Sequence, residues 1–490
     1  LVFTGLWCLY LNLNKAEILL IILWVGGTAY LFYKRDRPKY KKKLVFTPRA
    51  IRLFITSNLL FLYLTFDMLL RIFSSTQYAT LLVIFVIIAA QIMYQLAFYF
   101  ILLGILINHP IETVVNKYYL QSAKHLIRGS KAKIIGITGS YGKTSVKNIL
   151  HTLLSVKYKT LKTPESYNTP MGICKVIRGD LKPDYDFFIV EMGARRVGEI
   201  KELCDLVEPE IGIITAIGPQ HLETFGSLKN ISETKYELLK SLPDNGTAIL
   251  NCDDSICVDM VNKRRFQNIF LFSTDFDKKK IPQKEEISYT FVEAKNISTD
   301  SNGSGFILKY GRSEVDIKSP LLGRQNIHNI LAATAVALHY EVTLEEIKTA
   351  IKDIKPIPHR LQLIKNPNGI IIIDDAFNSN PVGAKMALDV LGKFKGGKRI
   401  LVTPGLVELG EIEYEENKKL GERAAAICDY VIVVGKTQAE PIIAGLEEKK
   451  FSSNKIKNVQ SLSTASQHLQ TILKAGDIIL FENDLPDNYL

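Results

Sequence analysis

Cysteine is scarce in this chain of 490 residues, and no two cysteines form a Cys-x-x-Cys pair. The six cysteines are scattered along the sequence. This distribution argues against a zinc site and a disulfide framework, and it suits a reducing cytosol. Low-complexity tracts and long-period internal repeats are absent as well. At this length the chain exceeds one ordinary domain and can form several hydrophobic cores.

An acidic excess is also missing, because the formal net charge is +11. We do not infer nucleic-acid binding from this charge, since much of the basic excess lies beside hydrophobic segments. The densest basic run is Lys34–Lys43, KRDRPKYKKK. Such runs mark the cytoplasmic side of membrane proteins. We therefore expect a membrane, and no nucleic acid, among the partners.

The first 109 residues contain three hydrophobic runs. The second run includes Arg52 and Asp67, whereas the third is long and uncharged. Buried core helices are the alternative, but an uncharged run of this length is rare in a soluble core. The runs are too many and too long for a cleaved signal peptide. We expect transmembrane helices in region 1–109, at 16–33, 51–70 and 78–107.

The positive-inside rule places Lys34–Lys43 in the cytoplasm. The second helix then leaves the cytoplasm and the third returns, so the chain after Asn108 is cytoplasmic. The sequence thus predicts a multi-pass membrane protein whose catalytic domains lie where ATP is available.

After the hydrophobic runs, short apolar segments typical of strands alternate with helical ones, which favours a parallel sheet covered by helices. Between Ser288 and Ser319, short alternating runs predict a small antiparallel insertion. A new α/β series begins after Pro356 and Pro358. The expected fold class is α/β: N-terminal transmembrane helices, a P-loop ATP-binding parallel-sheet domain with a small β insertion over 110–355, and a C-terminal Rossmann-like α/β domain over 356–490.

The strongest local motif is GITGSYGKTS, which ends at Ser145, follows a strand-like run and precedes a helical one. Glycines let the backbone wrap a phosphate chain, and the helix N-terminus offers free N–H groups. Lys143 would reach the β- and γ-phosphates, and Thr144 would ligate Mg²⁺. A chance glycine-rich turn is the alternative, because Ile137 stands where the strict eight-residue pattern has its first glycine. The predicted ATP contacts here are Gly139, Ser140, Gly142, Lys143, Thr144 and Ser145.

This shortened loop resembles that of the Mur ligases, and later motifs extend the resemblance. FIVEMGA resembles the strand that carries the family's metal-binding glutamate, here Glu191. IGPQHLETFGS places His221 at the family's metal-linked histidine, and SETKYELL places Lys235 at a lysine that is often carbamylated. The resemblance implies two Mg²⁺ ions, one held by Thr144 and Glu191 and the other by His221 and carbamylated Lys235.

Two further segments extend the resemblance toward the C-terminus. GRQNIHNILAA is similar to the start of the family's adenine-binding helix, and HRLQ and DDAFNSNP resemble the opening of the third domain in the MurF branch. The implied ATP-binding residues are Asn326, Asn329, Arg360, Asp374 and Asp375. The implied substrate-binding residues are Asn168, Thr169, Asn378 and Asn380.

The resemblance implies an ATP-dependent amide-forming ligase that works through an acyl phosphate. Its catalytic residues would be Lys143, His221, Lys235 and Arg360, its cofactors ATP and Mg²⁺, and its product a muramoyl peptide extended by D-alanyl-D-alanine or a similar amino acid or dipeptide amine. The precursor would be a small molecule or lipid-linked, and the protein would reside in the bacterial inner membrane.

Departures from the family leave alternatives. The family's uridine-binding first domain is absent, and hydrophobic runs take its place, so the acceptor could be lipid-linked or another peptide or polymer carboxylate. A non-catalytic membrane scaffold is a third function. The joint presence of Lys143, Thr144, Glu191, His221 and Arg360 argues against it, because a scaffold has no physical need for these residues together.

The individual residues also have plainer interpretations. Glu191 could be a solvated carboxylate at a strand end, and His221 an ordinary structural histidine. Lys235 could be an exposed helical lysine, Arg360 a salt-bridge partner near a hinge, and Asn329 a helix cap.

Overall fold

The computed structural model describes residues 46–75, 97–165, 167–261, 263, 266, 268–275, 289–377 and 379–484. The chain divides into two compact units, Leu1–Tyr118 and Tyr119–Leu490. We describe each unit by itself.

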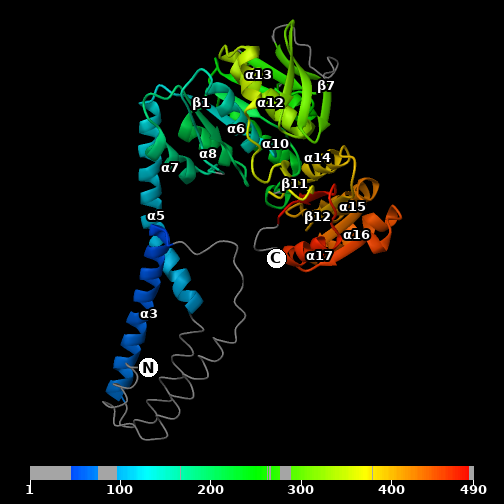
Figure 1. Cartoon of the computed structure of the whole chain (residues 1–490). Helices are drawn as coiled ribbons and strands as arrows, with labels where there is room; N and C mark the ends of the chain where they lie inside the picture. The colour runs from blue at the N-terminus through cyan, green and yellow to red at the C-terminus, as the bar shows by residue number, and fades with distance from the viewer. Residues whose placement is uncertain are drawn as a thin grey trace. The chain divides into compact units, whose positions relative to one another are not determined.

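The described part of the first unit contains two long helices, α3 (Pro48–Ser75) and α5 (Ala97–Arg128). Helix α5 continues into the second unit (Figure 1). The Arg52 guanidinium donates two hydrogen bonds, of 3.0 and 2.5 Å, to Glu112 Oε1. Asn108 Nδ2 donates to Thr56 Oγ1 at 3.0 Å. These polar contacts join the two helices through side chains.

The expectation of a multi-pass membrane protein is wrong. Within the described residues only one helical segment, Phe98–Arg128, is long and apolar enough to cross a membrane. Helix α3 covers the expected span at 51–70, part of whose side chains lie outside the described residues, and the expected span at 16–33 lies outside them entirely. Of the third expected span, the residues before Ala97 also lie outside them.

The second unit begins with a nine-stranded sheet in the order β2-β3-β1-β4-β5-β6-β7-β8-β9. The pairs from β2 through β7 are parallel, and β8 and β9 continue the edge in antiparallel pairing. The predicted β insertion is therefore an extension of the main sheet. The strands are β1 (Lys133–Thr138), β2 (Thr160–Lys162), β3 (Phe187–Glu191), β4 (Ile211–Ile214), β5 (Thr247–Asn251), β6 (Asn268–Ser273), β7 (Tyr289–Asp300), β8 (Gly303–Tyr310) and β9 (Ser313–Ser319).

Helices cover both faces of this sheet, as its continuously apolar strands require. In β1, Ile135 and Ile137 join one core with α6 and α12, whereas Ile134 faces a second core with α7 and α8. The predicted parallel α/β domain is thus confirmed. The helices are α6 (Lys143–Leu154), α7 (Pro170–Asp180), α8 (Glu199–Val207), α9 (Leu222–Phe225), α10 (Leu228–Ser241), α11 (Ser255–Val261), α12 (Gly323–His339) and α13 (Leu344–Lys352).

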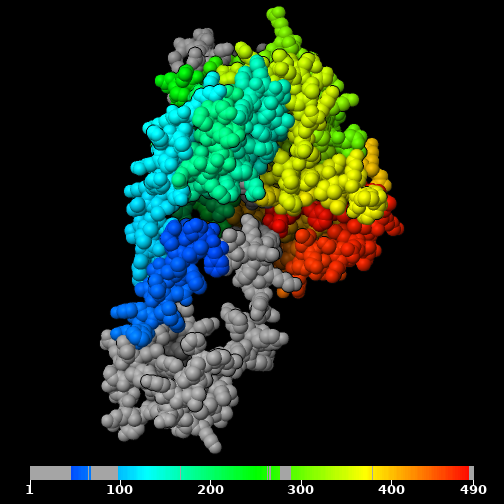
Figure 2. Space-filling model, turned by 60° about the vertical axis from the view of Figure 1, so that its left-hand side comes forward, coloured from blue at the N-terminus to red at the C-terminus, as the bar shows by residue number. Residues whose placement is uncertain are grey.

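A six-stranded sheet follows in the order β10-β11-β15-β12-β13-β14, parallel except for the edge strand β10. Strands β11 and β15 pair although about a hundred residues separate them, and Figure 2 shows red C-terminal surface next to yellow surface from earlier in the chain. The strands are β10 (Gln362–Lys365), β11 (Ile371–Asp375), β12 (Arg399–Thr403), β13 (Tyr430–Val434), β14 (Ile456–Val459) and β15 (Ile478–Glu482). The helices are α14 (Pro381–Leu391), α15 (Glu413–Ile427), α16 (Ala439–Glu448) and α17 (Leu462–Ile472).

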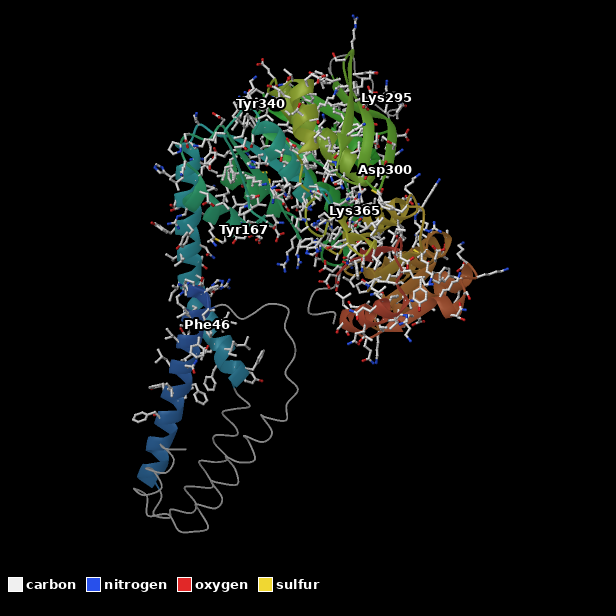
Figure 3. All side chains as sticks on the ribbon, viewed as in Figure 1. Phe46, Tyr167, Lys295, Asp300, Tyr340 and Lys365 are labelled. Carbon is white, nitrogen blue, oxygen red and sulfur yellow. The ribbon has the colours of Figure 1, made fainter. Side chains whose placement is uncertain are left out.

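The two sheets of the second unit contact each other at their margins. Lys365 Nζ, at the end of β10, donates to Asn302 Oδ1 at 3.2 Å. Asn302 belongs to the turn between β7 and β8, and the labels of Asp300 and Lys365 mark this region in Figure 3.

Helices α15 and α16 approach each other through two glycines. A Cβ on Gly445 would overlap the carbonyl oxygen of Lys418, and a Cβ on Gly421 would overlap that of Ile442. Backbone atoms cannot move aside as a flexible side chain can, so this packing requires glycine at both positions.

We therefore expect Gly445→Ala to lower the free energy of unfolding by about 1–3 kcal/mol, the usual cost of overpacking. Urea denaturation measures the change. Gly179→Ala is the matched control, because Gly179 also lies in a helix but a Cβ there meets nothing within 4 Å. The control should stay within about 1 kcal/mol of the native chain. Equal stability of the two variants would contradict the close helix contact.

Candidate active site

The glycine-rich loop connects β1 to the start of α6 at Lys143. Gly139 and Gly142 have φ values of +147° and +85°, in the region that favours glycine. A Cβ on Gly142 would come within 2.5 Å of Asn329 Oδ1, and a Cβ on Gly139 would overlap Thr215 Oγ1. Ser140 Oγ donates to the Gly218 carbonyl at 2.8 Å and fixes the loop to the segment after β4. The loop is therefore preshaped rather than a chance turn.

Lys143 folds back over this loop. Its ammonium donates to the carbonyls of Gly139 at 2.6 Å and Ser140 at 3.2 Å. Burial lowers the pKa of Lys143 to about 8 against the opposing attraction of Glu191, and the nearby Arg360 guanidinium lowers it further. Two cations thus approach the same region, which favours the binding of an anion between them.

Glu191, the last residue of β3, is the centre of a buried hydrogen-bond network. Its Oε1 accepts from Thr144 Oγ1 at 3.1 Å and from Asn168 Nδ2 at 3.3 Å. Its Oε2 accepts from Lys147 Nζ at 2.8 Å, and both partners of this ion pair are almost completely buried. Lys147 also donates to the Glu165 carbonyl. The solvated-carboxylate interpretation of Glu191 is therefore wrong.

Sequence reasoning missed Lys147. It lies four residues after Lys143 in α6, so the two side chains share one face of the helix. That spacing was a signal that could have identified Lys147.

His221 and Lys235 lie in different surroundings. His221 has a φ of +53°, and its Nδ1 forms a hydrogen bond with Glu408 Oε2, from the loop after β12. Lys235, in α10, is 3% exposed, so it is not an exposed helical lysine. Burial lowers the pKa of Lys235 to about 7, and the positive charge of Lys143 adds to this shift.

The chemistry of these donors fits one Mg²⁺ ion better than two. Thr144 and Glu191 offer hydroxyl and carboxylate oxygens within hydrogen-bond distance of each other, and oxygen donors suit Mg²⁺. Across the described segments, no three His, Cys, Asp or Glu side chains gather as a ready-made metal cluster. A second ion would need the carbamate oxygens that an unmodified Lys235 lacks.

A cavity of about 400 Å³ joins these groups. It collects residues from the glycine-rich loop, from the segment before α7, from the start of α12 and from the segment between β10 and α14. Of the predicted and described site residues, Gly139, Lys235 and Asp374 do not line it. The predicted site residues that do are Ser140, Gly142, Lys143, Thr144, Ser145, Asn168, Thr169, Glu191, His221, Asn326, Asn329, Arg360, Asp375 and Asn380.

A second cavity of about 530 Å³ shares Tyr141, Gln325 and Asn329 with the first. His328 Nε2 and Asp253 Oδ2 lie 2.7 Å apart on its wall. Sequence reasoning did not select these two residues, although His328 stands inside the quoted NIHN motif. The three shared residues form a common wall, so the second, polar cavity lies beside the first.

The segment after Pro358 brings Arg360, Asp375 and Asn380 to the first cavity. The Arg360 guanidinium lies over the Phe377 ring, 4.5 Å from its centroid. Asp375 Oδ1 accepts the backbone N–H of Leu361 at 3.0 Å. Asp374 instead bonds His359 at 2.8 Å, so its predicted contact with ATP remains a prediction.

The two predicted asparagines of this region have different outcomes. Asn380 caps α14, because its Oδ1 accepts from the N–H groups of Val382 and Gly383 at 3.1 and 3.0 Å. Asn378 lies outside the described residues.

Two known protein-family domains match the chain, one over the first sheet and one over the second. Residues 137–337 match the Mur ligase middle domain, and residues 359–482 match the Mur ligase, glutamate ligase domain. The UDP-N-acetylmuramoyl-tripeptide--D-alanyl-D-alanine ligase of Escherichia coli K12 is 33% identical over 347 residues, covering 70% of this chain and 74% of that one. Its counterpart in Bacillus subtilis is 28% identical over 364 residues, covering 74% and 75%.

Solved structures agree with these matches. The MurF ligase of Thermotoga maritima in complex with ADP has a TM-score of 0.66 at 26% identity, covering 75% of this chain and 80% of that one. MurF from Acinetobacter baumannii has a TM-score of 0.65 at 26% identity, covering 75% and 77%. The resemblance inferred from the motifs is confirmed: the chain belongs to the Mur ligase family, as an ATP-dependent ligase of the MurF type.

Proposed function

We propose that this chain joins D-alanyl-D-alanine to a UDP-linked muramoyl tripeptide with ATP as the energy source, in peptidoglycan synthesis. The observation that carries the proposal is the convergence of Lys143, Thr144, Glu191 and Arg360 on one cavity beside a polar chamber. The relatives named above act on these substrates according to their names. No observation on the described residues favours the lipid-linked acceptor considered from the sequence.

The site suits two successive displacements. An acceptor carboxylate oxygen attacks the γ-phosphorus of ATP, and ADP leaves. The amine nitrogen of the dipeptide, after losing a proton, then attacks the acyl carbon, and inorganic phosphate leaves. Lys143 and Arg360 stabilise the charge that develops on the transferring phosphoryl group, so catalysis rests on positioning and electrostatics.

Mg²⁺ fits beside Thr144 and Glu191 and would bring nucleotide phosphate and carboxylate together despite their mutual repulsion. For a second ion we propose a carbamate on Lys235. The lowered pKa of Lys235 leaves much of the amine neutral near pH 7. Only a neutral amine can form the N–C bond to carbon dioxide, with loss of a proton. His221 would complete this second site once it separates from Glu408.

We also propose the functional division of the chain into 1–109, 110–355 and 356–490. The central part would hold the nucleotide on Gly139, Asn326 and Asn329. The last part would supply Arg360 and Asp375, with Asn378 and Asn380 toward the amine. Asn168 and Thr169 would contact the acceptor, because they lie in the cavity beside Glu191.

The proposed activity has a direct test. Phosphate release from ATP should require the UDP-linked tripeptide and D-alanyl-D-alanine together, and mass spectrometry should find the extended peptide. Replacing D-alanyl-D-alanine by L-alanyl-L-alanine is the control for stereochemical selection. Release of phosphate without an extended peptide would refute the proposed reaction.

Lys143→Met should reduce turnover by about a thousandfold or more, since it removes a charge aimed at the transferring phosphoryl group. Because burial lowers the pKa of Lys143, the folded state disfavours its charged form, and an uncharged methionine should not lower Tm. Turnover and calorimetry measure the two effects. If the Lys143→Met variant kept the turnover of the unmutated chain, Lys143 would have no role in catalysis.

Lys235→Ala should reduce turnover by about a hundredfold or more, because it removes the proposed metal-binding carbamate. Acetate should restore part of the rate by supplying carboxylate oxygens. Lys229→Ala is the matched control on the same helix, because the Lys229 side chain is 81% exposed. In the unmutated chain, turnover should decrease as the pH is lowered from 7, because the Lys235 amine is increasingly protonated. Excess bicarbonate should oppose this decrease. Equal rates in the two variants would exclude the carbamate.

A further inference from the structure

Two carboxyl groups meet at the carboxyl ends of neighbouring strands in the second sheet. Asp375 ends β11 and Glu482 ends β15, and the two residues are register partners in a parallel pair. Their side chains therefore point to the same face of the sheet. Asp375 lines the first cavity, whereas Glu482 is fully buried and does not line it. Glu482 can therefore affect the reaction only through neighbours that line the cavity, which are Asp375 and Ser379.

The hydrogen bonds of Glu482 indicate which group carries a proton. Ser379 Oγ donates to Glu482 Oε1, and no described residue donates a conventional hydrogen bond to Oε2. Glu482 Oε2 thus lacks a donor, and its register partner across the β11–β15 pair is Asp375. A buried carboxyl oxygen beside a second carboxyl group is satisfied when one of the two groups keeps its proton and donates it to the other.

The surroundings place that proton on Glu482. Burial and the negative charge of Asp375 raise the pKa of Glu482 well above its usual range. Burial raises the pKa of Asp375 only to about 6, because the Arg360 guanidinium and the Leu361 N–H favour its ionised form. Near neutral pH these shifts favour an ionised Asp375 beside a neutral Glu482.

The charged groups around the pair are few. Arg360 favours the ionised form of Asp375, and the neighbouring Asp374 opposes it. Asp374 is itself bonded to His359. The elements packed against the pair, α14 and β12, carry three other charged side chains. Lys385 is exposed, Asp389 pairs with Arg423, and Arg399 pairs with Asp429.

Asp375 holds the backbone that carries Arg360. It accepts the Leu361 N–H at 3.0 Å, and Leu361 and His359 have left-handed φ values of +47° and +60°. Such values are uncommon outside glycine, so the segment needs fixed hydrogen bonds to keep its shape. The orientation of Arg360 toward the first cavity depends on this segment.

We propose that Glu482 is a positioning residue: as a neutral acid it donates a hydrogen bond to Asp375, and through Asp375 it holds Arg360 toward the nucleotide phosphates. The inference rests on the proposed function for its catalytic consequence. The proton on Glu482 itself is a separate, structural claim that needs no turnover to be measured.

Two variants of the full chain separate the hydrogen bond from mere packing. Glu482→Gln keeps a donor in place and cannot ionise, so turnover near pH 7.5 should stay within about twofold of native and the acid limb of the pH profile should not move. Glu482→Met removes the donor at similar volume. With all profiles measured in excess bicarbonate, so that Lys235 does not set the acid limb, it should lower kcat by about tenfold, the size of a lost hydrogen bond to a charged group, and shift the acid limb upward by about one pH unit.

A spectroscopic measurement tests the proton directly. Infrared difference spectra of native chain against Glu482→Gln at pH 8 should contain a carboxylic-acid carbonyl band present only in the native chain. Absence of that band would overturn the inference whether or not the protein is active. Identical pH profiles for native, Gln and Met variants, or equal losses in both variants, would also overturn it. If the native chain showed the band but made no extended peptide, the proposed function alone would fail.

Discussion

The buried ion pair between Lys147 and Glu191 is the interaction on which the rest of the site depends. A carboxylate taken out of water needs a compensating charge, and removing one partner of such a pair typically costs about 3–5 kcal/mol. Lys147 supplies this charge from α6 and also holds the Glu165 carbonyl. Thr144 and Asn168 approach the opposite oxygen of Glu191. One carboxylate thereby ties the glycine-rich loop, the segment before α7 and the end of β3 together.

This arrangement also constrains how a metal ion can approach. Oε2 of Glu191 accepts from an ammonium group, which would repel a second cation on that side. Of the two carboxylate oxygens of Glu191, only Oε1 lies beside a hydroxyl group, that of Thr144, which can itself ligate Mg²⁺. A Mg²⁺ ion at Oε1 would replace the hydrogen bond from Asn168 Nδ2, because an N–H donor cannot point at a cation. Binding of the ion would therefore be linked to the conformation of the segment that carries Asn168 through a single carboxylate.

The sequence predicted those features that are local. Continuous apolar runs predicted the parallel strands, and the GKTS loop predicted the strand-to-helix junction before Lys143. Contacts between segments that are distant in the sequence could not be predicted. They form only when the sheets form, and they include Lys147 with Glu165, His221 with Glu408 and Asp375 with Glu482. The multi-pass membrane expectation failed, because within the described residues only the helical segment Phe98–Arg128 is long and apolar enough to cross a membrane.

Three cationic side chains from different segments of the chain affect one another electrostatically. Lys143, Lys235 and Arg360 each have a pKa lowered first by burial, and Lys143 is lowered further by Arg360 as Lys235 is by Lys143. Their mutual repulsion is a cost that the folded chain carries before it binds anything. In the proposed reaction a nucleotide phosphate chain would offset that cost, and the negative charge that develops during phosphoryl transfer would offset more of it. Under that proposal the repulsion among the cations would favour the transition state over the bound ground state.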